Sequence, residues 1–233
     1  MMGFNDEGPI YQAQRSIDTN SVISKIFFRM FLGLLATALV AGYTYYSGLL
    51  EDFVARGGYI FCIVAELVVV LVFSFGFRKL SPGAVTALFY AYAILTGLTF
   101  SSIFVLFELQ SIAFAFLGTA AVFGVMALIG KNTKADLTNL GTILTISLIV
   151  AIVVSLINLF VGNSWLDIIL DWVILAIFMG FTVYDMNQII NMQGLDEIPD
   201  EKLYIYGAMQ LYLDFINIFI RILEIFGVRK LED

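Results

Sequence analysis

Seven long apolar runs constrain this chain more than any other feature of its sequence. Each is close to the length of about 20 residues that a helix needs to cross the hydrocarbon core of a bilayer. Lipid offers no water to backbone N–H and C=O groups, so a spanning run of this kind must be helical. The linkers are short, and the sequence therefore predicts an all-α, polytopic bundle of seven antiparallel transmembrane helices. The runs cover residues 26–47, 59–77, 84–107, 112–130, 140–161, 168–191 and 205–226.

Composition leaves little of the chain for anything outside the membrane. Of the 233 residues, 61% are hydrophobic and 13% are charged, a balance far from that of soluble domains. We predict a short cytoplasmic polar arm at 1–24 and a single seven-helix domain at 25–233. The arm lacks the basic and then apolar layout of a cleavable signal peptide. The net charge of −7 weighs against a nucleic-acid partner.

The chain contains no histidine and one cysteine, Cys62. The missing histidines exclude the usual zinc sites, His-based proton transfer and Ser/His or Cys/His nucleophiles. Cys62 has no disulfide partner within the chain and is interpreted as a small buried side chain. No nucleotide-binding motif or catalytic domain is present. The sequence thus indicates neither an enzyme nor a bound cofactor.

Basic residues predict the orientation in the membrane. Eight of them flank one set of helix ends, whereas Arg56 is alone at the other. Short basic loops are retained in the cytoplasm, so we expect a cytoplasmic N-terminus, and the compact loops suggest a bacterial inner membrane. Arg229 and Lys230 fall on the outer side if the last helix crosses. Either it crosses despite them, which its length favours, or it enters and returns. The eight are Arg15, Lys25, Arg29, Arg78, Lys79, Lys131, Lys134 and Lys202.

The same orientation places acidic residues on or near the outer face. They form either a rim that concentrates cations or ordinary solvated loop positions, and the sequence leaves both readings open. They are Glu51, Asp52, Glu108, Asp167 and Asp171.

The last apolar run carries a stripe of polar residues. Its members recur at steps of 4, 3, 4 and 3, which places them along one face of a helix. An ionised group in mid-bilayer costs about 2.5–3.5 kcal/mol on insertion scales, so this face must lie against protein or water. We expect Gln210 and Asn217 to line a path beside Asp214. Arg221 and Glu224 are expected to form a structural pair. The stripe consists of Gln210, Asp214, Asn217, Arg221 and Glu224.

Asp185 and Asp214 are the candidate switch. Asp185 lies near the cytoplasmic end of the sixth run, and Asp214 lies about ten residues into the seventh, a depth of roughly 15 Å. Two carboxyl groups within hydrogen-bonding reach share a proton and titrate as a pair. Such a pair senses pH without histidine, and its oxygens are the ligands that calcium prefers. In the alternative reading, Asp185 reaches the headgroups and Asp214 pairs with Arg221.

Three further charged residues belong to this hypothesis. Glu66, halfway along the second run, needs a partner such as Thr96 or Thr99, or lines the same ion path. Arg78 and Arg29 lie near the cytoplasmic boundary and are candidate counter-ions for Asp185. For both arginines, simple anchoring of the cytoplasmic side is an equally good explanation.

The residues around the two aspartates resemble the transmembrane Bax inhibitor motif (Bax inhibitor-1-like) family. The most specific matches are Tyr184-Asp185 and the segment LYLDFINIF at 211–219. The resemblance covers about residues 20–228 and includes FLGLLATA at 31–38, TGLT at 96–99 and TKADL at 133–137.

The resemblance implies seven helices with the last one central. It further implies a pH-sensitive passive calcium leak in which Asp185 and Asp214 form the proton sensor. Arg78 would latch the closed state and Glu66 would lie along the ion path. Calcium and protons, together with the lipid bilayer, would then be the partners.

Two other functions compete with a leak channel. An intramembrane aspartyl protease also needs two embedded aspartates, one of them in a Tyr-Asp pair as at Tyr184-Asp185. However, the residues before Asp214 are Leu-Tyr-Leu where that class has Gly-x-Gly. The other alternative is a regulator that binds a membrane protease or an apoptosis-related protein through the acidic segment 196–201 or the N-terminal arm. No spacing in the sequence selects such a protein partner.

Overall fold

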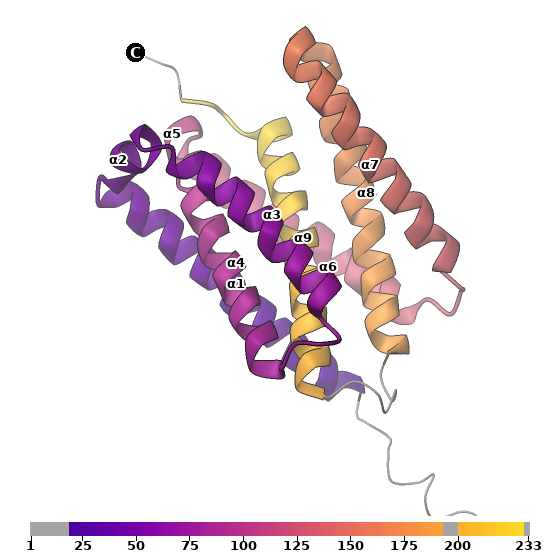
Figure 1. The fold of residues 1–233 in the computed structure, drawn as a ribbon. Helices are drawn as coiled ribbons and strands as arrows, with labels where there is room; N and C mark the ends of the chain where they lie inside the picture. The colour runs from indigo at the N-terminus through magenta and orange to yellow at the C-terminus, as the bar shows by residue number, and fades with distance from the viewer. Residues whose placement is uncertain (1–18, 193–199, 231–233) are drawn as a thin grey trace, which may run out of the picture.

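The computed structural model describes residues 19–192 and 200–230 and is drawn as a ribbon in Figure 1. Within these ranges the secondary structure is helical, apart from one isolated bridge between Phe107 and Arg229. The helices of the described residues are α1 (Thr19–Tyr46), α2 (Leu49–Ala55), α3 (Gly58–Gly76), α4 (Pro82–Phe100), α5 (Ile103–Leu106), α6 (Leu109–Asn132), α7 (Thr138–Val161), α8 (Ser164–Asn191) and α9 (Asp200–Phe226).

Each of the seven predicted apolar runs coincides with a helix, and the all-α class is confirmed. Six stretches are long and apolar enough to cross a membrane, with α4 and α5 together forming one of them. The helix α9, which covers the seventh run, is not among the six. It differs from them in the polar stripe along its length and in its burial. Sixteen of its 27 residues are buried, against two of 19 in α3, so α9 faces protein whereas α3 is largely exposed.

Local details differ from the sequence expectation in three places. First, α1 begins at Thr19, so residues 19–24 of the predicted arm are helical. Second, the loop after α1 contains the short helix α2, bounded by glycines at positive φ, Gly48 and Gly57. Third, the run 84–107 is interrupted between α4 and α5. The hydroxyls of Ser101 and Ser102 donate to the carbonyls of Leu98 and Thr99 at 2.6 and 2.8 Å, a local pairing that competes with regular helix.

The perimeter of the helix bundle is apolar. Large hydrophobic side chains on α3 and α7 are mostly exposed, a distribution that would cause aggregation in water and that suits contact with lipid. Examples are Phe61, Leu67 and Phe75 on α3 and Ile146, Val150 and Leu156 on α7.

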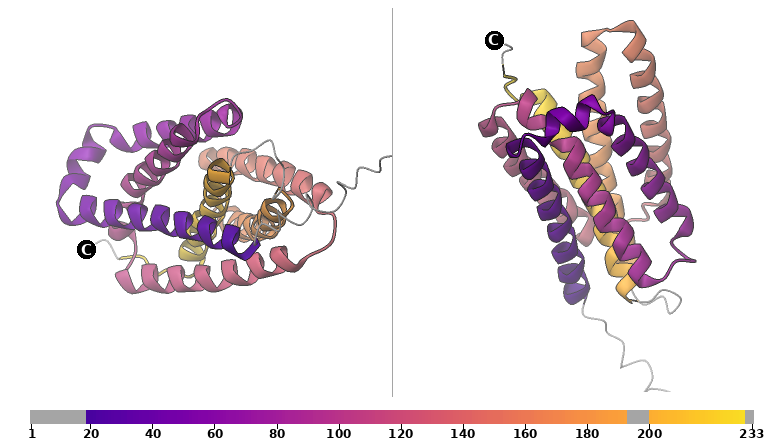
Figure 2. Two further views of the ribbon diagram at one scale, coloured as in Figure 1. Left: turned by 90° about the horizontal axis from the view of Figure 1, so that it is seen from below. Right: turned by 60° about the vertical axis from the view of Figure 1, so that its left-hand side comes forward.

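Helix α9 packs against α1, α4, α6 and α8, as Figures 1 and 2 show from three directions. At its beginning, Lys202 Nζ donates to the carbonyl of Arg78 at 3.3 Å, just before α4 starts. Beyond its other end, Lys230 N donates to the Leu106 carbonyl at 2.9 Å, and Glu108 N donates to the Val228 carbonyl at 3.0 Å. Helix α9 and the segment that follows it therefore extend from one end of α4–α5 to the other.

Candidate functional site

Asp185 on α8 and Asp214 on α9 are both buried at the interface between these two helices. Their exposed fractions are 4% and 3%, and α8 and α9 are in extensive contact. The two carboxyl groups are close enough to interact electrostatically, and Thr182, one turn before Asp185, lies beside Asp214. The geometry thus brings together the two acidic residues that the sequence singled out.

Among the described residues, no cation pairs with either carboxyl group. Oδ2 of Asp214 is buried without a hydrogen-bond partner among the described residues. No ion pair in this part of the chain involves Asp185 or Asp214. Burying an ionised carboxylate without a partner costs several kcal/mol or more. The arrangement is therefore compatible with a pair that holds at least one proton.

The alternative reading of the two aspartates does not fit the observed contacts. Asp185 is buried and does not reach the surface. Arg221, the proposed partner of Asp214, instead donates from Nη1 to Asp171 on α8 at 2.5 Å. Glu224 accepts from Arg229 at 2.7 Å. The expected pair of Arg221 with Glu224 is therefore wrong, because each side chain finds an oppositely charged group elsewhere in the tertiary structure.

The two arginines predicted as counter-ions lie elsewhere in this conformation. Arg29 pairs with Glu201 in the first turn of α9 at 2.5 Å and lies over the ring of Tyr204. The side chain of Arg78 is exposed, and its carbonyl accepts from Lys202. These contacts tie α1 and the α3–α4 loop to the start of α9.

Glu66 is half-buried on α3 and accepts a hydrogen bond from Thr99 Oγ1 of α4 at 2.9 Å. This is one of the two contacts that the sequence predicted for it. Gln210 and Asn217 are half-buried, about one turn before and after Asp214. Asn217 donates to the carbonyl of Leu213 in its own helix at 2.8 Å.

The match to a family model decides how this chain is classified. The model for "Inhibitor of apoptosis-promoting Bax1" matches residues 19–230. The chain belongs to the Bax inhibitor-1-like family.

Bacterial proteins are among the family members most similar to this chain. It is 39% identical over 214 residues to the inner membrane protein YbhL of Escherichia coli K12, which covers 89% of this chain and 92% of that protein. It is 33% identical over 224 residues to an uncharacterized protein of Borreliella burgdorferi, covering 94% and 97%. With its six apolar helices, this Bax inhibitor-1-like chain is an integral, multi-pass protein of a bacterial inner membrane.

The sequence did not reveal one polar network of this Bax inhibitor-1-like protein. The hydroxyl of Tyr212 on α9 lies 2.6 Å from Thr37 Oγ1 on α1, and Thr37 donates in turn to the carbonyl of Ala93 on α4 at 2.9 Å. The network joins three helices two residues from Asp214. Its only sequence signal was the position of Thr37 among the small residues Gly33, Ala36 and Ala41 of the first apolar run.

The described residues of this family member contain no group of three or more acidic, Cys or His side chains that could hold a metal ion. Calcium takes six to eight oxygen ligands in a stable protein site. Two carboxyl groups supply only part of such a set.

Two of the five predicted outer acidic residues are engaged within the protein. Asp167 accepts from Asn158 Nδ2 at 2.6 Å, and Asp171 accepts from Arg221. Glu51 and Asp52 are exposed on α2. The acidic segment 196–201 falls largely outside the described residues, as does the arm before residue 19. Within the described part of the acidic segment, Glu201 pairs with Arg29.

Proposed function

We propose that this protein is a passive, pH-sensitive cation leak channel that conducts calcium and is gated by Asp185 and Asp214. One observation carries the proposal. Two acidic side chains from adjoining helices are buried together, and no cation among the described residues neutralises them. Intramembrane ionisable residues are costly and mark ion or proton pathways by default.

The gate follows from the electrostatics of such a pair. With one proton shared, the two carboxyl groups attract each other and hold α8 against α9, which closes the path. When the pair loses this proton as pH rises, two negative charges lie in a low-dielectric environment and repel. Separation of the helices would then expose carboxylate oxygens to calcium.

We further propose that α9 is the seventh crossing and the centre of the bundle, with the N-terminus in the cytoplasm. The proposal is supported by the contacts of α9 with four other helices and by the contacts of its two ends with opposite ends of α4–α5. A central helix explains how a polar stripe can be tolerated in lipid, because the stripe then faces other helices.

Flux measurements in liposomes test the gate. Purified protein in vesicles that contain a calcium-sensitive dye should leak faster as the external pH rises from acid to neutral. Asp214→Asn removes one member of the pair and so removes the charge repulsion. We expect the pH dependence of the leak to become several-fold weaker, and Asp185→Asn to act in the same direction.

Asp136→Asn is the matched control. Asp136 is exposed in the α6–α7 loop, where hydrogen bonds from Thr138 hold the pKa of its carboxyl below the ordinary value. It therefore stays ionised across the tested range, and its substitution should leave the pH profile unchanged. A wild-type protein without calcium flux at any pH would contradict the proposal and favour a regulator that binds other membrane proteins.

A further inference from the structure

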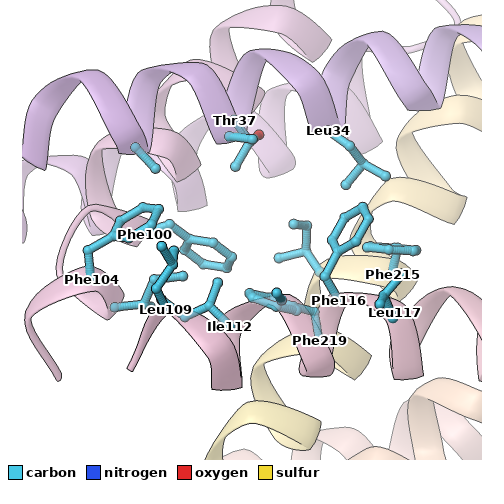
Figure 3. Close-up of a pocket in the computed structure, with 15 residues that line it drawn as sticks. Leu34, Thr37, Phe100, Phe104, Leu109, Ile112, Phe116, Leu117, Phe215 and Phe219 are labelled. Atoms are coloured by element: carbon cyan, nitrogen blue, oxygen red, sulfur yellow. The ribbon is translucent and has the colours of Figure 1, made fainter. Parts of the chain in front are cut away.

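An apolar cavity of about 490 Å³ lies between α1, α4–α5, α6 and α9 (Figure 3). Of the 15 residues that line it, Thr37 alone is polar. The Thr37 hydroxyl is already engaged with Tyr212 and with the carbonyl of Ala93. The cavity thus offers hydrogen-bond partners to neither water nor a polar ligand. Apolar cavities of this kind stay dry or take up apolar molecules.

The cavity opens sideways, between α1 and α6. Near the predicted cytoplasmic end, Phe27 of α1 and Phe123 of α6 are in edge contact, with ring centroids 6.1 Å apart. Further along, these helices are separated by the cavity, and its α6 wall includes exposed side chains. Leu109 and Leu117 are 60% and 63% exposed. In a membrane, this opening faces the lipid chains.

Basic groups lie at the outer end of the cavity. Lys230 Nζ donates to the carbonyl of Phe104 at 2.7 Å and lies 5.6 Å from the ring centroid of Tyr45. Phe104 lines the cavity, and its ring stacks on Tyr45 at 5.4 Å. Arg229 lies close by, over the ring of Phe107, and its charge is paired with that of Glu224. The Phe104 carbonyl uses one of the three N–H donors of the Lys230 ammonium, and the other donors suit a phosphate.

We propose that this cavity is a phospholipid site, in which one acyl chain fills the apolar space and an anionic headgroup binds Lys230. Charge selects the occupant, because an apolar slot that opens to the lipid and has a lysine at its outer end matches a phospholipid better than a neutral apolar molecule. The floor of the slot includes Phe215 and Phe219 of α9. The bound chain would therefore support the helix that carries Asp214. The site does not depend on the leak activity.

Photo-crosslinking tests the site. The full-length protein is reconstituted in phosphatidylcholine vesicles that contain a trace of phosphatidylglycerol with a photoreactive group in its acyl chain. Peptide mapping after illumination should show labelling of the cavity residues several-fold above that of Ile146 and Val150 on the outer face of α7. Equal labelling of the two regions would overturn the proposal, since it would mean that the lipid at the cavity is ordinary bulk lipid.

Two kinds of variant separate the acyl chain from the headgroup. Ala113→Phe fills the cavity and should lower its labelling several-fold, whereas Ala120→Phe adds the same bulk at an exposed α6 position outside the lining and should not. Lys230→Gln leaves the cavity intact. It should reduce labelling by phosphatidylglycerol but not by phosphatidylcholine carrying the same photoreactive chain, and Arg56→Gln, at another exposed cation of the outer end, should change neither.

The Lys230→Gln variant keeps the test decisive if Ala113→Phe impairs folding. Unchanged labelling by both lipids in Lys230→Gln would overturn the assignment of an anionic headgroup. Unchanged labelling in a folded Ala113→Phe variant would overturn the assignment of the acyl chain.

Discussion

Several polar side chains in this bundle pair with a neighbouring helix. Arg221 pairs with Asp171 of α8, Glu66 accepts from Thr99 of α4, and Tyr212 reaches Thr37 of α1. In each case a group on one helix is satisfied by the helix packed against it. Unpaired polar groups cost more in a low-dielectric environment than in water, so these contacts favour one arrangement of neighbours.

The pair of Arg221 with Asp171 makes a prediction about stability. The side chains are 28% and 17% exposed, so Asp171→Asn leaves a partly buried guanidinium without its counter-charge. We expect a loss of about 1–3 kcal/mol, less than for a fully buried pair. Thermal unfolding in detergent should show a Tm lower by several degrees.

A more exposed pair at the end of α9 provides the control. Glu224→Gln breaks the contact with Arg229. The side chains of Glu224 and Arg229 are 29% and 67% exposed, so the substitution should cost about 0–1 kcal/mol. The double variant Asp171→Leu with Arg221→Met should recover much of the loss, because it removes both charges. An equal drop in Tm for Asp171→Asn and Glu224→Gln would refute this view of the pair.

At the scale of elements, small residues allow helices to approach closely. Gly97 of α4 packs directly on the backbone of α1, so that a Cβ at this position would lie 2.8 Å from the Thr37 carbonyl oxygen and 2.7 Å from Val40 Cβ. Glycine permits such contacts in membrane bundles, where van der Waals packing drives association. This contact also positions Thr37 for its hydrogen bond to Tyr212.

Gly97→Ala should therefore push α1 away from α4. We expect a loss of about 1–3 kcal/mol, typical of overpacking, and a weaker bond between Thr37 and Tyr212. Gly124→Ala is the matched control, because nothing lies within 4 Å of a Cβ there. It should be neutral or stabilising by up to about 1 kcal/mol. Comparison of the two Tm values checks the prediction, and a Gly97→Ala protein as stable as Gly124→Ala would contradict it.

At the scale of the whole molecule, the two ends of the bundle differ in charge and in their contacts with α9. The start of α9 is held by Arg29 and by the carbonyl of Arg78, and the segment after it is held by the Leu106–Glu108 backbone. The basic residues of the α3–α4 and α6–α7 loops lie at the first of these ends. A crossing α9 would bring Arg229 and Lys230 to the second end, opposite to the positive-inside bias.

Thiol labelling tests this topology. In a Cys62→Ala background, single cysteines are introduced as Arg56→Cys, Lys134→Cys and Arg229→Cys. A membrane-impermeant thiol reagent applied to intact spheroplasts should label Arg56→Cys and Arg229→Cys, whereas Lys134→Cys should react only after lysis. Protection of Arg229→Cys together with Lys134→Cys would show that α9 does not cross.

The sequence by itself determined the helical class, the approximate position of each apolar run and the presence of Asp185 and Asp214 within two of them. These features follow from local rules: about 20 apolar residues fit the bilayer, and an acidic residue among them is costly. Spacing along a single helix could not reveal which groups pair with Arg221, Glu224 and Arg29. Their partners lie on another helix or beyond the end of α9. Only the tertiary structure decided these pairs, the network of Thr37 with Tyr212 and the cavity beneath Lys230, because each arises where separate helices meet.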